Sequence, residues 1–150
     1  MRQRGFTLIE LMVVLAVAAV LLSVGVPSFF ESTTRARLEG AVNELAIDLQ
    51  YARSEAVRER AIVVLLVAAN GGSYTISNPT ATLKTVSLPA GVTLSADSRV
   101  SYDALRGLSQ ATTFTAAASG LMPTLRVSTN ALGRVQVCAP TGKFGSSPAC

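Results

Sequence analysis

FTLIELMVVLAVAAVLLSVGV, residues 6 to 26, is the stretch that decides the fold, and Glu10 is its one charged residue. A helix of this length spans about 30 Å, enough to cross the hydrocarbon core of a bilayer. The alternative is a secretory signal peptide, but its apolar region is usually shorter and ends at small residues. A Gly-Val-Pro turn at residues 25–27 follows here instead. We therefore expect a membrane-spanning helix over residues 6–27.

The charges around this stretch predict its orientation. Arg2 and Arg4 come directly before it, and positively charged flanks stay in the cytoplasm. The rest of the chain then lies on the far side of the membrane. In bacteria that compartment is oxidising, so Cys138 and Cys150 can form a disulfide. Such a bond closes a short C-terminal loop and contributes about 3 kcal/mol. Two unpaired thiols are the alternative.

Beyond Pro27 the apolar residues become periodic, which predicts an amphipathic helix over residues 28–60. Pro27 removes a helical hydrogen bond, so with Gly25 beside it we expect a bend or a looser segment there. The helix as a whole should run from Phe6 to about Arg60. Its apolar stripe consists of Leu38, Val42, Leu45, Leu49, Ala52 and Ala56.

Residues 61–150 have the pattern of a β-rich head. Short segments rich in β-branched residues alternate with turn signals such as Asn70-Gly71-Gly72, which is typical of an antiparallel sheet or sandwich. The predicted class is therefore α+β, with the sheet packed on the amphipathic half of the helix. The expected strands are residues 62–67, 73–77, 82–88, 92–95, 99–102, 112–117, 124–129 and 134–138.

The head is basic and lacks the usual catalytic groups. It contains six basic residues against Asp97 and Asp103, and the chain has no histidine. We expect no enzyme, no metal site and no cofactor, because neither a nucleophile–base pair nor a cluster of metal ligands is present. Asp97 and Asp103 are best explained as exposed loop residues. The positive charge favours polyanionic partners, although a modest excess is also common on ordinary surfaces.

The segment Arg4-Gly5-Phe6-Thr7-Leu8-Ile9-Glu10-Leu11 resembles the class III signal of type IV pilins and type II secretion pseudopilins. The resemblance implies that a prepilin peptidase removes residues 1–5, cuts between Gly5 and Phe6, and methylates the amine of Phe6. It also implies that Glu10 meets the N-terminal amine of a neighbouring subunit. A carboxylate at mid-membrane costs about 3 kcal/mol, so it normally has a partner or a function. The alternative is that Glu10 reaches the headgroups.

The segments Leu45 to Ala56 and Gly133 to Cys138 are similar to the GspH/FimT group of minor pilins and pseudopilins. The resemblance implies the type IV pilin fold and a pilin-type filament. A FimT-like minor pilin of a type IV pilus, with DNA uptake in natural transformation, is the first interpretation. A GspH-like pseudopilin of type II secretion is the alternative. Gln136 replaces the second arginine of the group's Gly-Arg-x-Arg motif, which weakens the case for DNA.

Alternating residues suggest how a DNA-binding face could form. If the apolar side chains of the last two strands share one face, Ser128 lies opposite Arg134, and Arg126 lies opposite Gln136, around a loop at 129–133. Arg126, Arg134 and Gln136 then share the solvated face, with Lys143 nearby. Three cations can hold a few phosphates without sequence preference. The alternative is an ordinary solvated sheet face.

Together these features predict the location and partners of the chain. We expect a single-pass inner-membrane protein with a cytoplasmic N-terminus and a periplasmic head, reaching the cell surface after assembly. The partners are other pilin subunits, the prepilin peptidase, the membrane and, if the basic face is used, double-stranded DNA.

Overall fold

One long helix precedes eight strands. The structure, a computed structural model, describes residues 7–150, apart from the side chains of residues 24–28. Helix α1 (Leu8–Glu59) has 52 residues, close to the predicted extent, although Phe6 lies outside the described residues. The bend expected at residues 25–27 falls where side chains are not described. The chain divides into two compact units, the first ending at Thr33 and the second beginning at Thr34.

The first unit contains the N-terminal part of α1. The Thr7 hydroxyl accepts a hydrogen bond from the amide of Glu10 (3.3 Å), the usual arrangement of an N-cap. The large apolar side chains from Leu8 to Leu22 are exposed. Within the described residues, no helical segment is both long enough and apolar enough to span a membrane. The predicted span extends past the described side chains at both of its ends.

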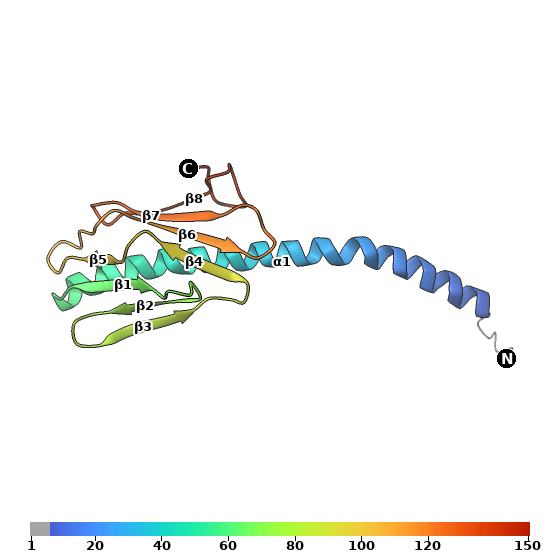
Figure 1. The fold of residues 1–150 in the computed structure, drawn as a ribbon, viewed down its shortest axis with the longest axis horizontal. Coiled ribbons are helices and arrows are strands. Elements are labelled where there is room, and N and C mark those ends of the chain that lie inside the picture. The colour runs from blue at the N-terminus through green and yellow to red at the C-terminus, as the bar shows by residue number, and fades with distance from the viewer. Residues whose placement is uncertain (1–6) are drawn as a thin grey trace, which may run out of the picture. The chain divides into compact units, whose positions relative to one another are not determined.

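The second unit has the predicted strands, arranged in two four-stranded antiparallel sheets along the C-terminal half of α1 (Figure 1). The strand order is β3-β2-β1-β5 in one sheet and β4-β6-β7-β8 in the other. All eight predictions match an observed strand to within a residue at each end. The strands are β1 (Val63–Val67), β2 (Ser73–Ser77), β3 (Thr82–Ser87), β4 (Val92–Ala96), β5 (Val100–Tyr102), β6 (Thr112–Ala118), β7 (Leu125–Thr129) and β8 (Val135–Cys138).

A single hydrophobic core joins α1 to both sheets. Every residue of the predicted helical stripe is buried, and Tyr74, Tyr102 and Phe114 are the largest side chains that are fully buried. Of the three tyrosines, Tyr74 and Tyr102 are fully enclosed and Tyr51 is exposed. The two enclosed rings come from β2 and β5 and belong to the hydrophobic core that α1 shares.

A buried acid fixes α1 to the first sheet. Asp48 lies outside the apolar stripe, yet its side chain is buried. It accepts hydrogen bonds from the Tyr74 hydroxyl (2.7 Å) and from Nζ of Lys84 (2.7 Å). Burial, together with the bond to Asp48, raises the pKa of Tyr74, and the same acid raises the pKa of Lys84. A paired carboxylate can therefore remain in the core without an orphaned charge.

The C-terminus is held by the disulfide between Cys138 and Cys150, which the structure contains. Inside the loop, Phe144 is buried and the guanidinium of Arg35 lies 4.5 Å from the centre of its ring. Gly145 packs directly against the carboxylate of Glu39. The loop thus covers α1 where the second unit begins.

Candidate functional site

The residues predicted for processing and assembly lie at the start of the chain. Gly5 and Phe6 fall outside the described residues. Glu10 is exposed in the first turn of α1, three residues after the capping Thr7. Exposure leaves its carboxylate accessible to a partner.

The predicted pairing of β7 with β8 is wrong by two residues. Ser128 lies opposite Gln136, not Arg134, and Arg126 lies opposite Cys138, not Gln136. The shift by an even number keeps the same side chains on each face, as the period of two requires. It moves the loop, which becomes residues 130–134.

Asn130 explains the shift. Its side-chain oxygen accepts hydrogen bonds from the amides of Leu132 (3.0 Å) and Arg134 (2.9 Å), and its own amide donates to the carbonyl of Arg134 (3.1 Å). Gly133 supplies the left-handed backbone that the turn needs, with φ of 71°. An asparagine that closes its own turn therefore sets the register, and alternation of side chains alone could not reveal it.

The corrected register separates the cations that were expected to lie together. Arg126 is level with the disulfide, whereas Arg134 is in the turn, four residues or about 13 Å farther along β7. Lys143 belongs to the disulfide loop, at the Arg126 end of the hairpin. Arg126, Arg134, Gln136 and Lys143 are all exposed, but they do not form one patch.

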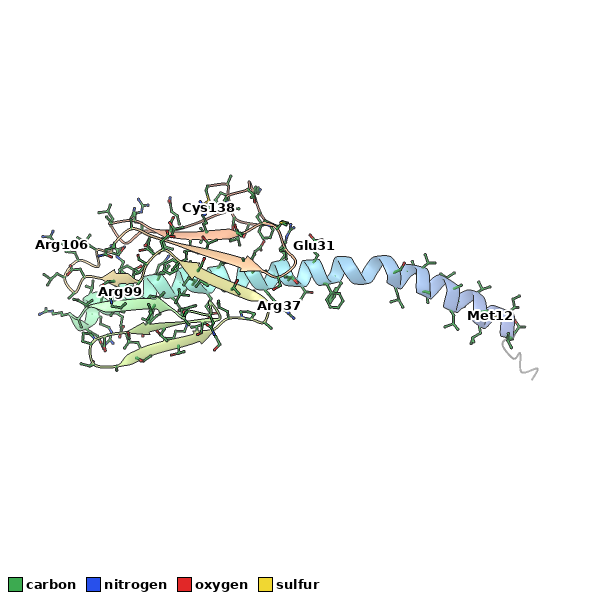
Figure 2. All side chains as sticks on the ribbon, viewed as in Figure 1. Met12, Glu31, Arg37, Arg99, Arg106 and Cys138 are labelled. Atoms are coloured by element: carbon green, nitrogen blue, oxygen red, sulfur yellow. A yellow bond between two sulfur atoms is a disulfide. The ribbon has the colours of Figure 1, made fainter. Side chains whose placement is uncertain are left out.

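Arg134 instead lines a pocket with Arg53 of α1 and Arg106 of the loop between β5 and β6. The pocket has a volume of about 500 Å³, and Gln50 and Ser54 contribute polar groups to its wall. Figure 2 shows Arg106 at the end of the head where α1 terminates. The described residues place no ion-pair partner on any of these three arginines. The site is therefore cationic, with no ion pair to neutralise it in the part of the chain that the structure describes.

Two glycines hold the side chain of Arg53 in place. A Cβ at Gly107 would lie 2.9 Å from Cγ of Arg53, and one at Gly133 would lie 3.0 Å from its Nε. Gly133 also approaches the backbone of Gly107, since its Cβ would be 2.6 Å from that carbonyl oxygen. Both glycines have positive φ, so any other residue would be strained as well as too large. The two loops close tightly around the arginine and orient it.

Arg53 and Arg106 were not among the site residues predicted from the sequence. Arg53 follows Ala52 of the apolar stripe, so its position at the edge of the core was readable, but its partners were not. Arg106 is separated from Arg134 by 28 positions, and only the pairing of β6 with β7 brings their loops together. The signal available was the presence of a glycine next to each loop arginine.

Asp97 and Asp103 are exposed and lie in loops, as predicted. Among the described residues, no group of three or more His, Cys, Asp or Glu could hold a metal ion. Asp103 caps a turn, because its carboxylate accepts hydrogen bonds from the backbone amides of Leu105 (3.3 Å) and Arg106 (3.1 Å). This acid positions the loop of Arg106.

Two family profiles match the chain. The family described as type II transport protein GspH matches residues 41–133, and the prokaryotic N-terminal methylation motif matches residues 1–26. Among curated proteins, the pilin-like protein PilA1 of Thermus thermophilus is 41% identical over 75 residues, 49% of this chain and 47% of that protein. A fimbrial protein of Pseudomonas aeruginosa is 33% identical over 81 residues, 54% of this chain and 52% of that protein. The chain thus spans about half the length of these relatives.

Solved structures of two minor subunits share the fold. The type IV minor pilin FimU of Pseudomonas aeruginosa aligns with a TM-score of 0.62 and 25% identity, covering 77% of this chain and 97% of that one. The minor pseudopilin EpsH of the type 2 secretion system of Vibrio cholerae aligns with a TM-score of 0.59 and 15% identity, covering 69% and 98%. The second likeness concerns the fold alone.

Proposed function

The chain belongs to the GspH family of type II transport proteins, which are structural and not enzymatic, and from this premise we propose that it is a FimT-like minor pilin of a type IV pilus. The observation that carries the proposal is the exposed apolar helix from Leu8 to Leu22, which lies within the methylation motif matched over residues 1–26. Likeness to FimU at 25% identity, against 15% for EpsH, favours the pilus. A pseudopilin of type II secretion is the second candidate, favoured by the description of the family.

The proposal divides the chain into four parts. Residues 1–5 are a leader that the prepilin peptidase removes, and residues 6–27 span the inner membrane and later enter the filament core. Residues 28–60 form the amphipathic helix, and residues 61–150 form a periplasmic head that reaches the cell surface. Gly5→Val should leave the leader attached because the side chain obstructs the peptidase, which would be visible as an unshifted band. A band of mature size would refute the processing step.

Assembly depends on Glu10 pairing with the freed amine of a neighbouring subunit. Glu10→Ala should leave the protein stable in the membrane and absent from sheared filaments, because the apolar helix then lacks its polar contact. Glu31→Ala is the matched control, since Glu31 is an exposed acid of the same unit. Normal incorporation of Glu10→Ala would contradict the mechanism.

The pilus and secretion candidates separate in the cell. Deletion of the gene should reduce surface pili and leave the secreted proteins unchanged if the chain serves a type IV pilus. Loss of secretion with normal pili would assign it to the type II pseudopilus.

We also propose weak, non-specific binding of double-stranded DNA by the basic head. Its support is the excess of six basic residues over two acids in residues 61–150. The predicted contacts are Arg126, Arg134, Gln136 and Lys143, now at two places on the hairpin. Gel retardation should be lost in Arg134→Ala combined with Lys143→Ala and should weaken with salt. No retardation at low salt would contradict it.

A further inference from the structure

The pocket at the far end of the head has features that filament assembly does not explain. Arg53, Arg106 and Arg134 come from three separate segments and line one cavity of about 500 Å³. Like charges brought together repel one another, and no carboxylate among the described residues forms an ion pair with them. The pocket therefore gathers positive charge that no ion pair among the described residues compensates.

The pocket is also built and not incidental. The stem of Arg53 is enclosed between Gly107 and Gly133, two left-handed positions where a Cβ would collide with it. Asp103 caps the turn that presents Arg106, and Asn130 caps the turn that presents Arg134. The side chain of Arg53 and the backbone turns that carry Arg106 and Arg134 are thus fixed by separate local devices. Pre-positioning reduces the entropy that a ligand must remove on binding.

We propose that this pocket is a binding site for a phosphate group carrying about two negative charges. Guanidinium groups donate in a planar fork that matches phosphate oxygens, and charge-assisted bonds of this kind are about twice as strong as neutral ones. A lone carboxylate would neutralise one of the three cations, whereas a phosphate monoester or a pyrophosphate neutralises more. Gln50 supplies a further donor on the wall, whereas the Ser54 hydroxyl already donates to the carbonyl of Tyr51 (2.8 Å).

The pocket shares Arg134 with the residues proposed to contact DNA, but its other two arginines do not belong to that set. Arg126 and Lys143 lie at the other end of the β7–β8 hairpin, and Arg53 is on the helix. The pocket proposal is independent of the assembly proposal, because Glu10 lies in the first unit and the pocket residues lie in the second. Phosphate binding can therefore be tested whether or not Glu10→Ala enters filaments. The phosphate can come from a small molecule or from the phosphorylated end of a DNA strand, and the chemistry recognised is the same.

Calorimetric titration of the full mature chain with pyrophosphate, in a non-ionic detergent at constant ionic strength, tests the proposal. Saturable binding of one pyrophosphate per chain is expected. Arg106→Gln and Arg134→Gln should each weaken the affinity at least about tenfold, because a bond to a charged group is lost. The side chains of Arg106 and Arg134 are exposed, so these two substitutions leave the core intact. Arg53 is half-buried, and Arg53→Gln lowers stability, so it is not used in this test. Titration with chloride alone gives the background.

Arg37→Gln is the matched control. Arg37 is an exposed arginine of the same helix, sixteen residues or about 24 Å before Arg53, and it does not line the pocket (Figure 2). Absence of saturable binding would overturn the proposal. An equal loss in Arg37→Gln and in the pocket variants would also overturn it.

A short duplex identifies the source of the phosphate once pyrophosphate binding is established. Competition by a 5′-phosphorylated duplex, but not by the same duplex without its terminal phosphates, supports the site and assigns it to DNA ends. Absence of competition supports the site and assigns it to small phosphates.

Discussion

The two parts of helix α1 differ in how they dispose of their apolar side chains. Between Leu38 and Ala56 the apolar stripe is buried, and Leu38, Leu49 and Ala52 are 0% exposed. Between Leu8 and Leu22 the large apolar side chains are exposed, for example 69% for Leu21. Both parts belong to one helix, but the apolar residues are continuous in the first part and periodic in the second.

The difference shows what each part is for. The second part obtains its stability from tertiary packing on the two sheets of its own chain, as most amphipathic helices do. The first part has no such cover within the described residues, and a continuous apolar surface of that length requires a membrane or other subunits. One helix therefore combines a folding element with an assembly element.

The largest expected effect on stability comes from truncating one leucine in each part of α1 to alanine. Leu49→Ala should lower the free energy of unfolding of the second unit by about 2–5 kcal/mol, because it leaves a cavity in a closed core. Leu15→Ala should change it by less than about 0.5 kcal/mol, since Leu15 is 60% exposed. Urea denaturation in detergent, followed by the signals of the β-rich head, measures both. Equal losses would show that the first part also contributes to the core.

The disulfide sharpens the position of the boundary between the two parts. Cys150→Ser should lower the free energy of unfolding by about 3 kcal/mol, because the unfolded chain loses a covalent constraint over 12 positions. It should also increase amide exchange in α1 around Glu39, where Gly145 and Phe144 cover the helix. Exchange that stays unchanged there would place the boundary farther along α1.

Within the second part of α1, a buried acid can be compared with an exposed acid one turn earlier. Asp48→Ala should cost about 1–3 kcal/mol, because it leaves the Tyr74 hydroxyl buried without its acceptor. Glu44→Ala, the control one turn earlier, removes only an exposed contact with Lys84 at 3.6 Å and should cost about 0–1 kcal/mol. Equal effects of the two variants, measured by urea denaturation, would contradict a special role for burial.

Element positions were readable from the sequence because each depends on nearby residues. The stripe from Leu38 to Ala56 and the β-branched runs recur with periods that report burial directly, so α1 and all eight strands lie where they were expected. The parity of β7 and β8 was also correct, since each strand carries its own alternation.

Contacts between distant segments were not readable. The register of β7 with β8 depends on side-chain bonds of Asn130, and the pocket depends on which loops meet at Arg53. The burial of Asp48, which lies outside the apolar stripe, was not readable because Tyr74 and Lys84, its partners, are 26 and 36 positions away. The observed site therefore differs from the predicted site more than the observed fold differs from the predicted fold.

The smallest predicted effect concerns the buried hydroxyl of Tyr102, for which the described residues offer no hydrogen-bond partner. Tyr102→Phe removes that unsatisfied group and should leave stability at neutral pH unchanged or higher by up to about 1 kcal/mol.

Burial raises the pKa of Tyr102 to about 12, against a lowering by Arg53, whereas an unfolded tyrosine ionises near pH 10. Between about pH 10 and 12 the unfolded chain releases this proton first, so the free energy of unfolding falls as pH rises. Urea denaturation at pH 9 and 11.5 should show a smaller fall for Tyr102→Phe, with Tyr51→Phe, which removes an exposed phenol, as the matched control. The fall should not vanish, because Tyr74 also has a raised pKa; an equal fall in both variants would mean that the ring of Tyr102 is not enclosed as its burial implies.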